Sequence, residues 1–97
     1  MFIRVVNYEI KPGMMEEAEK VYHNLTAQAL QDQAGFQSGY ALINTQTGIA
    51  LTVGVWNSKE DFEKFSSTGA GKELPAQITP LLANPPSVNE FDRMLEA

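Results

Sequence analysis

Hydrophobic residues recur along this chain with two different periods, and the segments that carry them alternate. From Ile49 to Trp56 apolar residues stand on both parities and no position is charged, so both faces of this strand are expected to be buried. Residues 2–10 and 36–44 also have the composition of strands. The turn sequence 44–48 is short, so strands 36–44 and 49–56 are expected to form an antiparallel hairpin. Within 36–44, Gly39 marks a possible bulge or a place of close approach.

Two helical regions lie between these strands. Over about residues 14–33 the apolar positions follow a single stripe with a period of about 3.6 residues. The stripe consists of Met14, Ala18, Val21, Leu25 and Ala29. Ser58 precedes Asp61 by three residues, so it is expected to cap a second helix whose apolar face begins with Phe62 and Phe65. The sequence after Phe65 is expected to interrupt that helix, and a further helical piece is expected from near Pro75 to near Pro80.

The last strand is expected over Val88 to Leu95, after the extended Pro85-Pro86 pair. The resulting order is βαββαβ, which predicts one α+β domain over residues 1–97, with a ferredoxin-like four-stranded antiparallel sheet. Helices attached to one such sheet cover one face and leave the other open. Because the strands are apolar on both parities, we expect a second copy to cover the open face in a symmetric homodimer. The alternative is a monomer with an exposed apolar sheet.

Composition narrows the classes of partner and of site. Twelve acidic and seven basic residues give a net charge of −5, which disfavours nucleic acid and anionic membrane surfaces. The chain has no cysteine and no apolar run of membrane-spanning length, so we expect a soluble cytoplasmic protein. The single histidine, His23, is expected to point to solvent. Without cysteine it cannot form a catalytic zinc site or a Cys/His pair within one subunit.

The chain resembles the antibiotic biosynthesis monooxygenase family of dimeric α+β barrels over nearly its whole length. The resemblance rests on the βαββαβ order, the Pro-Gly after the first strand, the Ala-Gly-Phe before the second, and above all VGVWNSKEDFEKF at residues 53–65. It implies a substrate pocket between the sheet and the helices, with the dimer on the opposite face. The superfamily includes cofactor-independent quinone-forming monooxygenases, haem-degrading monooxygenases, isomerases and chains with no established activity.

Asn7 is the candidate catalytic residue. It faces the same way as Ile3 and Val5 on the first strand, and its amide can donate a hydrogen bond that stabilises an enolate or phenolate. Haem-degrading relatives have an asparagine at a corresponding place. Alternatively, Asn7 only satisfies backbone or solvent groups near the strand end. Arg4 has the other parity and is expected on the dimer side, paired with an acid.

Four aromatic residues are candidates for substrate binding, and each has core packing as its alternative role. They are Trp56, Phe62, Phe65 and Tyr22. Phe65 occupies the position at which haem-degrading and some quinone-forming relatives have a tryptophan. Pro75 stands where the haem-degrading relatives have a histidine. These two departures argue against haem, and we expect no cofactor and no metal.

The sequence therefore predicts a cofactor-independent monooxygenase that oxidises an apolar phenolic or quinol-type substrate. Its expected partners are a small apolar or aromatic ligand and a second copy of the chain, with higher oligomers left open. The sequence identifies no residue as the general base. The alternative is a non-catalytic dimeric binding or accessory module of the same fold, and a haem-degrading enzyme is the less favoured third possibility.

Overall fold

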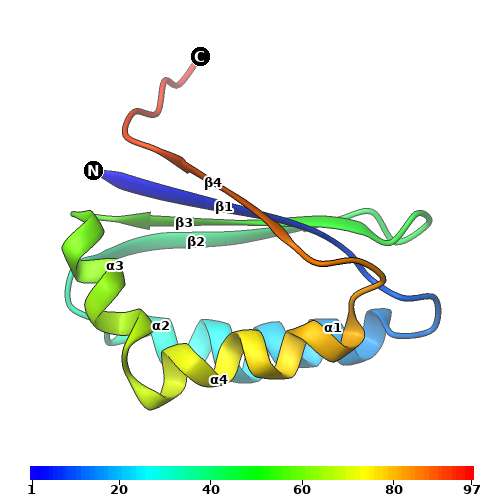
Figure 1. The fold of residues 1–97 in the computed structure, drawn as a ribbon. Coiled ribbons are helices and arrows are strands. Elements are labelled where there is room, and N and C mark those ends of the chain that lie inside the picture. The colour runs from blue at the N-terminus through cyan, green and yellow to red at the C-terminus, as the bar shows by residue number, and fades with distance from the viewer.

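The chain folds into a four-stranded antiparallel sheet with all its helices on one face (Figure 1). The computed structural model describes the backbone of residues 1–97 and every side chain except those of residues 25–28. The elements are β1 (Phe2–Glu9), α1 (Met15–Val21), the π-helical η1 (Tyr22–Ala27), α2 (Gln28–Gln31), β2 (Phe36–Ile43), β3 (Ile49–Trp56), α3 (Lys59–Ser66), α4 (Gly69–Ile78), the 3-10 turn η2 (Thr79–Leu81) and β4 (Ser87–Phe91). The sheet order is β2-β3-β1-β4. The predicted α+β ferredoxin-like fold is confirmed.

Strand register defines the two faces of the sheet. Along β1 the even-numbered residues point toward the helices, and we call this side the inner face. Val6 lies at its middle, opposite Thr52 of β3 and Val88 of β4. The odd-numbered residues Ile3, Val5 and Asn7 point the other way, onto the outer face. The expected hairpin of β2 and β3 is confirmed, since the two strands pair antiparallel.

Two separate hydrophobic clusters join the inner face to the helices. The aromatic cluster consists of Phe2, Trp56 and Phe65 and ties β1 and β3 to α3. The second cluster consists of Ile10, Ala18, Ala50 and Leu82 and ties the other end of the sheet to α1 and to the chain after η2. All seven side chains are at most 7% exposed. The sheet and the helices are therefore packed together at both ends of the molecule. The helices span the space between the two clusters.

The first helical region is not one continuous α-helix. α1 begins at Met15, and Met14 is its exposed N-cap. The π-helical η1 uses i→i+5 hydrogen bonds, which shift the residues after it around the helix axis relative to an α-helical stripe. Leu30, which lies off the predicted stripe, consequently packs beside Ala29 against the aromatic cluster. The predicted position of Leu25 lies outside the described side chains.

The second helical region begins as expected, but it is interrupted for only two residues. Ser58 Oγ accepts a hydrogen bond from the backbone N–H of Asp61 at 3.2 Å, so the predicted N-cap is confirmed. α4 begins at Gly69 and not near Pro75, which lies inside it. Thr68 Oγ1 caps α4 by accepting from the N–H of Gly71 at 3.1 Å. A side chain at Gly71 would overlap the carbonyl oxygen of Phe65, so this glycine permits the close turn between α3 and α4.

One strand detail meets one of its two expected alternatives, and another differs from expectation. The register irregularity of β2 lies between Phe36 and Ser38, whereas Gly39 is the place of close approach, because a Cβ there would lie 3.0 Å from Cζ of Phe36. β4 ends at Phe91 and not at Leu95. The reason is that Phe91 pairs with Ile3 near the start of β1, so the neighbouring strand offers almost no further partners.

The outer face carries large apolar side chains that are open to solvent. Tyr40, Leu42 and Ile49 are 58%, 58% and 62% exposed, and β2 and β3 bring them together beside Leu51 and Val53 through the hairpin register. Val5 and Asn7 continue this surface on β1. No helix covers it in Figure 1. Within the described part of the chain, no helix is both long and apolar enough to cross a bilayer.

We expect Ser58→Ala to lower the free energy of unfolding by about 1 kcal/mol, because the cap satisfies a backbone donor in the first turn of α3. Urea denaturation followed by circular dichroism measures the change. The matched control is Ser67→Ala at the other end of α3, where the exposed hydroxyl donates to the carbonyl of Lys64, and its effect should stay within about 0.5 kcal/mol. Equal losses in the two variants would contradict the role of the cap.

Candidate functional site

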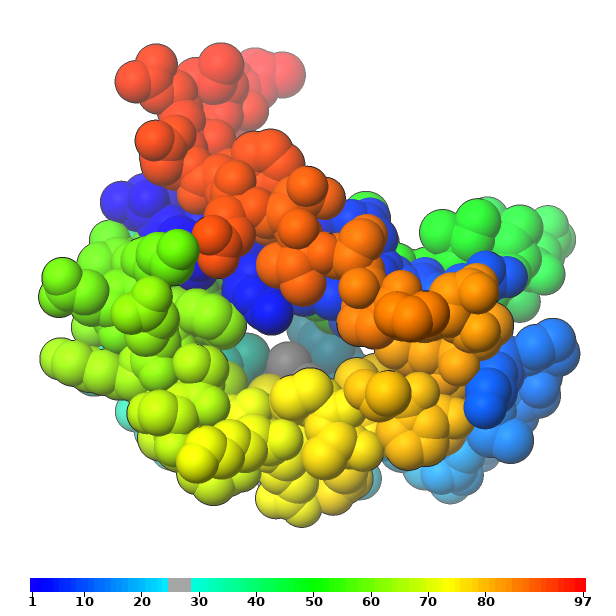
Figure 2. Space-filling model, in the orientation of Figure 1, coloured from blue at the N-terminus to red at the C-terminus, as the bar shows by residue number. Residues whose placement is uncertain are grey.

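A cavity of about 510 Å³ lies between the inner face and the helices, in the space between the two hydrophobic clusters. Figure 2 shows the surface hollowed between α4 and the strands β1 and β4. Every layer of the fold contributes to the lining. Its apolar side chains include Val6, Ile10, Val21, Leu30, Leu74 and Val88.

Small residues on β2 and β3 form the floor of this cavity. Gly39 of β2 lies opposite Gly54 of β3, which in turn lies opposite Arg4. In the next inward-facing row, Ala41 pairs with Thr52. Two glycines, an alanine and a threonine project little above the sheet, so their side chains leave the gap between the strands and the helices unfilled.

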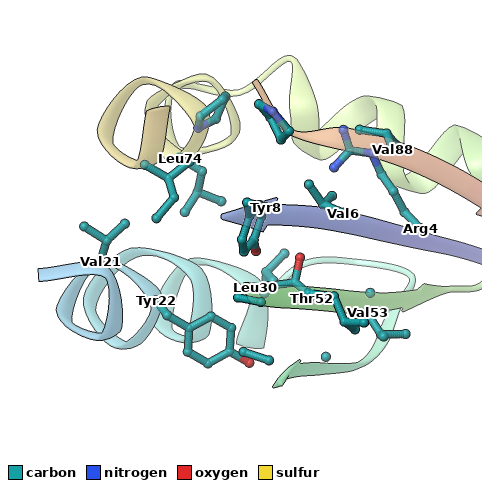
Figure 3. A pocket seen from close by; sticks show the side chains of 18 of the residues that line it. Arg4, Val6, Tyr8, Val21, Tyr22, Leu30, Thr52, Val53, Leu74 and Val88 are labelled. Atoms are coloured by element: carbon teal, nitrogen blue, oxygen red, sulfur yellow. The ribbon is translucent and has the colours of Figure 1, made fainter. Parts of the chain in front are cut away.

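The predicted aromatic residues lie together at one end of the cavity. The ring centroid of Trp56 is 5.8 Å from that of Phe62 and 5.6 Å from that of Phe65. All three line the cavity, and Tyr22 lines it from η1 (Figure 3). Trp56 is 3% exposed and belongs to the aromatic cluster, so it packs in the core and borders the cavity at the same time. The part of these four residues in substrate binding stays a prediction.

Asn7 lies away from these residues. It stands on the outer face, between Leu51 of β3 and Ser87 of β4, and is not among the described residues that line the cavity. The physical reason is the burial of Phe2 in the aromatic cluster. Side chains of a strand alternate, so an inward Phe2 turns every odd-numbered residue of β1 outward. The expectation that Asn7 points into a pocket under the helices is not met.

The same alternation brings Arg4 into the cavity, which corrects its expected place on the dimer side. Its guanidinium carbon lies 4.8 Å from the ring centroid of Phe62, within the range of a cation–π contact. Burial lowers the pKa of Arg4, while Glu90 and Tyr8 act to raise it. An arginine remains protonated at neutral pH despite such a shift. Arg4 therefore supplies a fixed positive charge.

Tyr8 is a second polar group that sequence reasoning did not single out. Burial raises the pKa of its phenol, a side-chain hydrogen bond with Thr52 acts in the opposite direction, Tyr22 raises the pKa further and Arg4 lowers it. Figure 3 shows Tyr8 and Thr52 side by side, with Arg4 further along β1. At neutral pH Tyr8 is a hydrogen-bond donor and not a base.

The charges of the described lining residues have one sign. Arg4 and Lys72 are cationic, and none of these residues is Asp, Glu or His. His23 is exposed. Among the described side chains no group of three or more His, Cys, Asp or Glu residues is gathered to hold a metal ion. The site thus offers apolar surface, hydroxyl groups and positive charge.

Comparisons with known proteins place this geometry in context. Residues 1–75 match the model of the family described as antibiotic biosynthesis monooxygenase. A search of curated proteins gives no significant match. SnoaB from Streptomyces nogalater, a cofactor-independent oxygenase solved as a point mutant, superposes with a TM-score of 0.84 at 16% identity, covering 98% of this chain and 94% of its own.

Two further solved structures carry the same family name. One, from Nitrosomonas europaea, has a TM-score of 0.86 at 11% identity and covers 98% of this chain and 100% of its own. The other, from Caulobacter crescentus, has a TM-score of 0.86 at 20% identity and covers 97% of this chain and 90% of its own.

Tyr8 should make the stability of the protein depend on alkaline pH. Because the folded pKa is raised above the usual 10.0, the stabilisation is fully present below that value and is lost as the pH rises through the folded pKa. We expect Tyr8→Phe to lose less stability over that range than the wild type, measured by urea denaturation at a series of pH values. Identical pH dependence in wild type and Tyr8→Phe would contradict the assignment.

Proposed function

This chain belongs to the antibiotic biosynthesis monooxygenase family, and we propose that it catalyses the cofactor-independent oxidation of a phenolic or quinol-type small molecule. The observation that carries the proposal is the apolar cavity under the helices, with aromatic side chains at one end. Its volume of about 510 Å³ falls within the range of small-molecule sites, about 300–1,000 Å³. Rings such as those of Phe62 and Tyr22 suit a flat aromatic ligand.

The chemistry needs little from the protein. A phenol that loses its proton becomes a phenolate, which transfers one electron to dioxygen. The radical and superoxide then combine at the ring carbon opposite the oxygen, forming the C–O bond of a peroxide. The proton lost at the start neutralises the peroxide anion to a hydroperoxide. Loss of the C–H proton from that carbon then breaks the O–O bond. One oxygen atom becomes the second quinone carbonyl, and the other leaves as hydroxide, which takes up the C–H proton to form water.

An apolar cavity favours this reaction, because fixed groups hold the charge of the phenolate and the apolar walls keep part of the solvent from the peroxide. The aromatic cluster closes one end of the cavity, and the second cluster closes the other. The structural similarity to SnoaB, described as a cofactor-independent oxygenase, supports the proposal by analogy.

We also propose that the outer face is covered by a second copy of the chain. The exposed Tyr40, Leu42 and Ile49 form an apolar surface on the two adjacent strands β2 and β3, and a twofold arrangement would let this surface cover itself. Asn7 stands within the same face. In the dimer its amide would be removed from solvent.

We expect phenols or quinols to stimulate oxygen uptake by the wild type, and Ala41→Leu to reduce kcat/KM about tenfold. The reason is that the larger side chain fills the floor of the cavity, and overpacking costs about 1–3 kcal/mol. An oxygen electrode measures the rate. Ala76→Leu makes the same change at an exposed residue of α4 that does not line the cavity, and should keep the wild-type rate. A ligand that binds in the cavity without oxygen uptake would favour the non-catalytic binding module.

Asn7→Ala tests the remaining catalytic candidate in the same assay. Because Asn7 lies on the outer face, we expect the rate to stay within about twofold of the wild type. A large loss in a variant that still dimerises would place the chemistry on the outer face and overturn the assignment to the cavity.

We expect the wild type to be a dimer at micromolar concentration and Leu42→Glu to be a monomer, because a charge cannot be buried unpaired in an apolar interface without a large cost. Size-exclusion chromatography with light scattering measures the mass. Thr45→Glu adds the same charge in the hairpin turn, outside the apolar surface, and should remain dimeric. A monomeric wild type, or two monomeric variants, would contradict the proposed interface.

A further inference from the structure

The cavity has a charge opposite in sign to that of the whole chain. The protein carries twelve acids and seven bases, yet the charged groups among the described lining residues are the cations Arg4 and Lys72. A concave site with walls of low polarity concentrates the field of the charges that line it. The cavity is therefore suited to an anionic ligand, although the net negative charge of the whole protein repels anions at long range.

Arg4 is the better placed of the two cations. It is half-buried on the inner face and its guanidinium lies against Phe62, whereas Lys72 is exposed on α4. The acid next to Arg4 in the sheet is Glu90, and this carboxylate is bound by Lys59 at 3.3 Å. The ion pairs among the described side chains do not include Arg4. Among the described side chains, its guanidinium therefore has no ion-pair partner that a ligand would have to displace.

The cavity also lacks a group that could take a proton from the substrate. Its described lining contains no carboxylate or imidazole, and Tyr8 stays protonated at neutral pH because burial raises its pKa. A phenol bound here must either arrive ionised or release its proton to solvent. In both cases the population of the reactive anion depends on how strongly the cavity stabilises it.

We propose that Arg4 binds the ionised oxygen of the substrate, so that the cavity selects phenols and enols acidic enough to bind as anions. Arg4 takes the role of anion stabiliser that the sequence suggested for Asn7. The planar guanidinium forms charge-assisted hydrogen bonds with an oxyanion, and the small residues Gly54 and Gly39 beside it leave room for the ring that carries that oxygen. The inference deepens the proposed oxidation, but its binding part can be tested separately.

The binding test uses para-nitrophenol, whose neutral and ionised forms absorb at different wavelengths, so its pKa can be read while it is bound. We expect the wild type to lower this pKa relative to free solution. Arg4→Gln should raise the bound pKa by about one unit or more, which corresponds to about tenfold weaker binding of the anion. Arg4→Lys keeps the charge and should retain part of the shift.

Three controls isolate Arg4. Lys64→Gln removes a positive charge from an exposed residue of α3 that does not line the cavity and should leave the bound pKa unchanged. Para-nitroanisole has the same ring without an ionisable oxygen, so it should bind wild type and Arg4→Gln equally, which also shows that the variant is folded. If Lys72→Gln or Tyr8→Phe, and not Arg4→Gln, removes the shift, the assignment to Arg4 is overturned.

Turnover supplies an independent test. If the substrate itself must ionise, the rising limb of kcat/KM against pH should move with the pKa of the phenol across a series of substituted substrates. A limb that stays at one pH for all phenols would reveal a base in the protein and overturn the inference. Oxygen uptake that is equal in Arg4→Gln and wild type would remove Arg4 and leave the proposed oxidation standing. If the protein shifts the bound pKa through Arg4 but no phenol stimulates oxygen uptake, the role of Arg4 in binding stands and the proposed oxidation is overturned.

Discussion

The burial of Phe2 against Trp56 and Phe65 is the contact on which the rest of this structure depends. Side chains of a strand alternate between faces, so one inward residue decides the direction of all its neighbours. With Phe2 inward, Arg4 and the other even-numbered residues of β1 enter the space under the helices. The odd-numbered residues then form the outer face. A shift of β1 by one residue in its pairing would move its inner-face side chains to the outer face and its outer-face side chains to the inner face.

The cavity exists because apolar packing is concentrated at the two ends of the molecule. Each hydrophobic cluster joins strands to helices, and the helices span the distance between them. Beneath this span β2 and β3 place small residues such as Gly39 and Gly54. A uniform row of leucine or isoleucine would have closed the gap. The open space is therefore a property of local residue size, within a fold that many other sequences adopt.

The strands and their pairing could be predicted because their patterns are local and strong. Ile49 to Trp56 has no charged residue, the turn before it is short, and Ser58 gives the second helical region a defined start. The direction of β1 could not be predicted, since its apolar residues occupy both parities. The π-helical η1 and the start of α4 at Gly69 were also missed. In those places contacts with distant elements override the local pattern, as propensity is a weak guide where packing decides.

The separation of the two hydrophobic clusters from the cavity floor has a consequence for the evolution of such proteins. Most members of the clusters also border the cavity, but the floor residues Gly39, Ala41, Thr52 and Gly54 belong to neither cluster. Substitutions at Ala41 or Gly54 alter the contour of the floor without removing a member of either cluster. Floor substitutions that fit a new ligand therefore carry little risk to folding. This allows one fold to support many chemistries in sequences that share few identical residues.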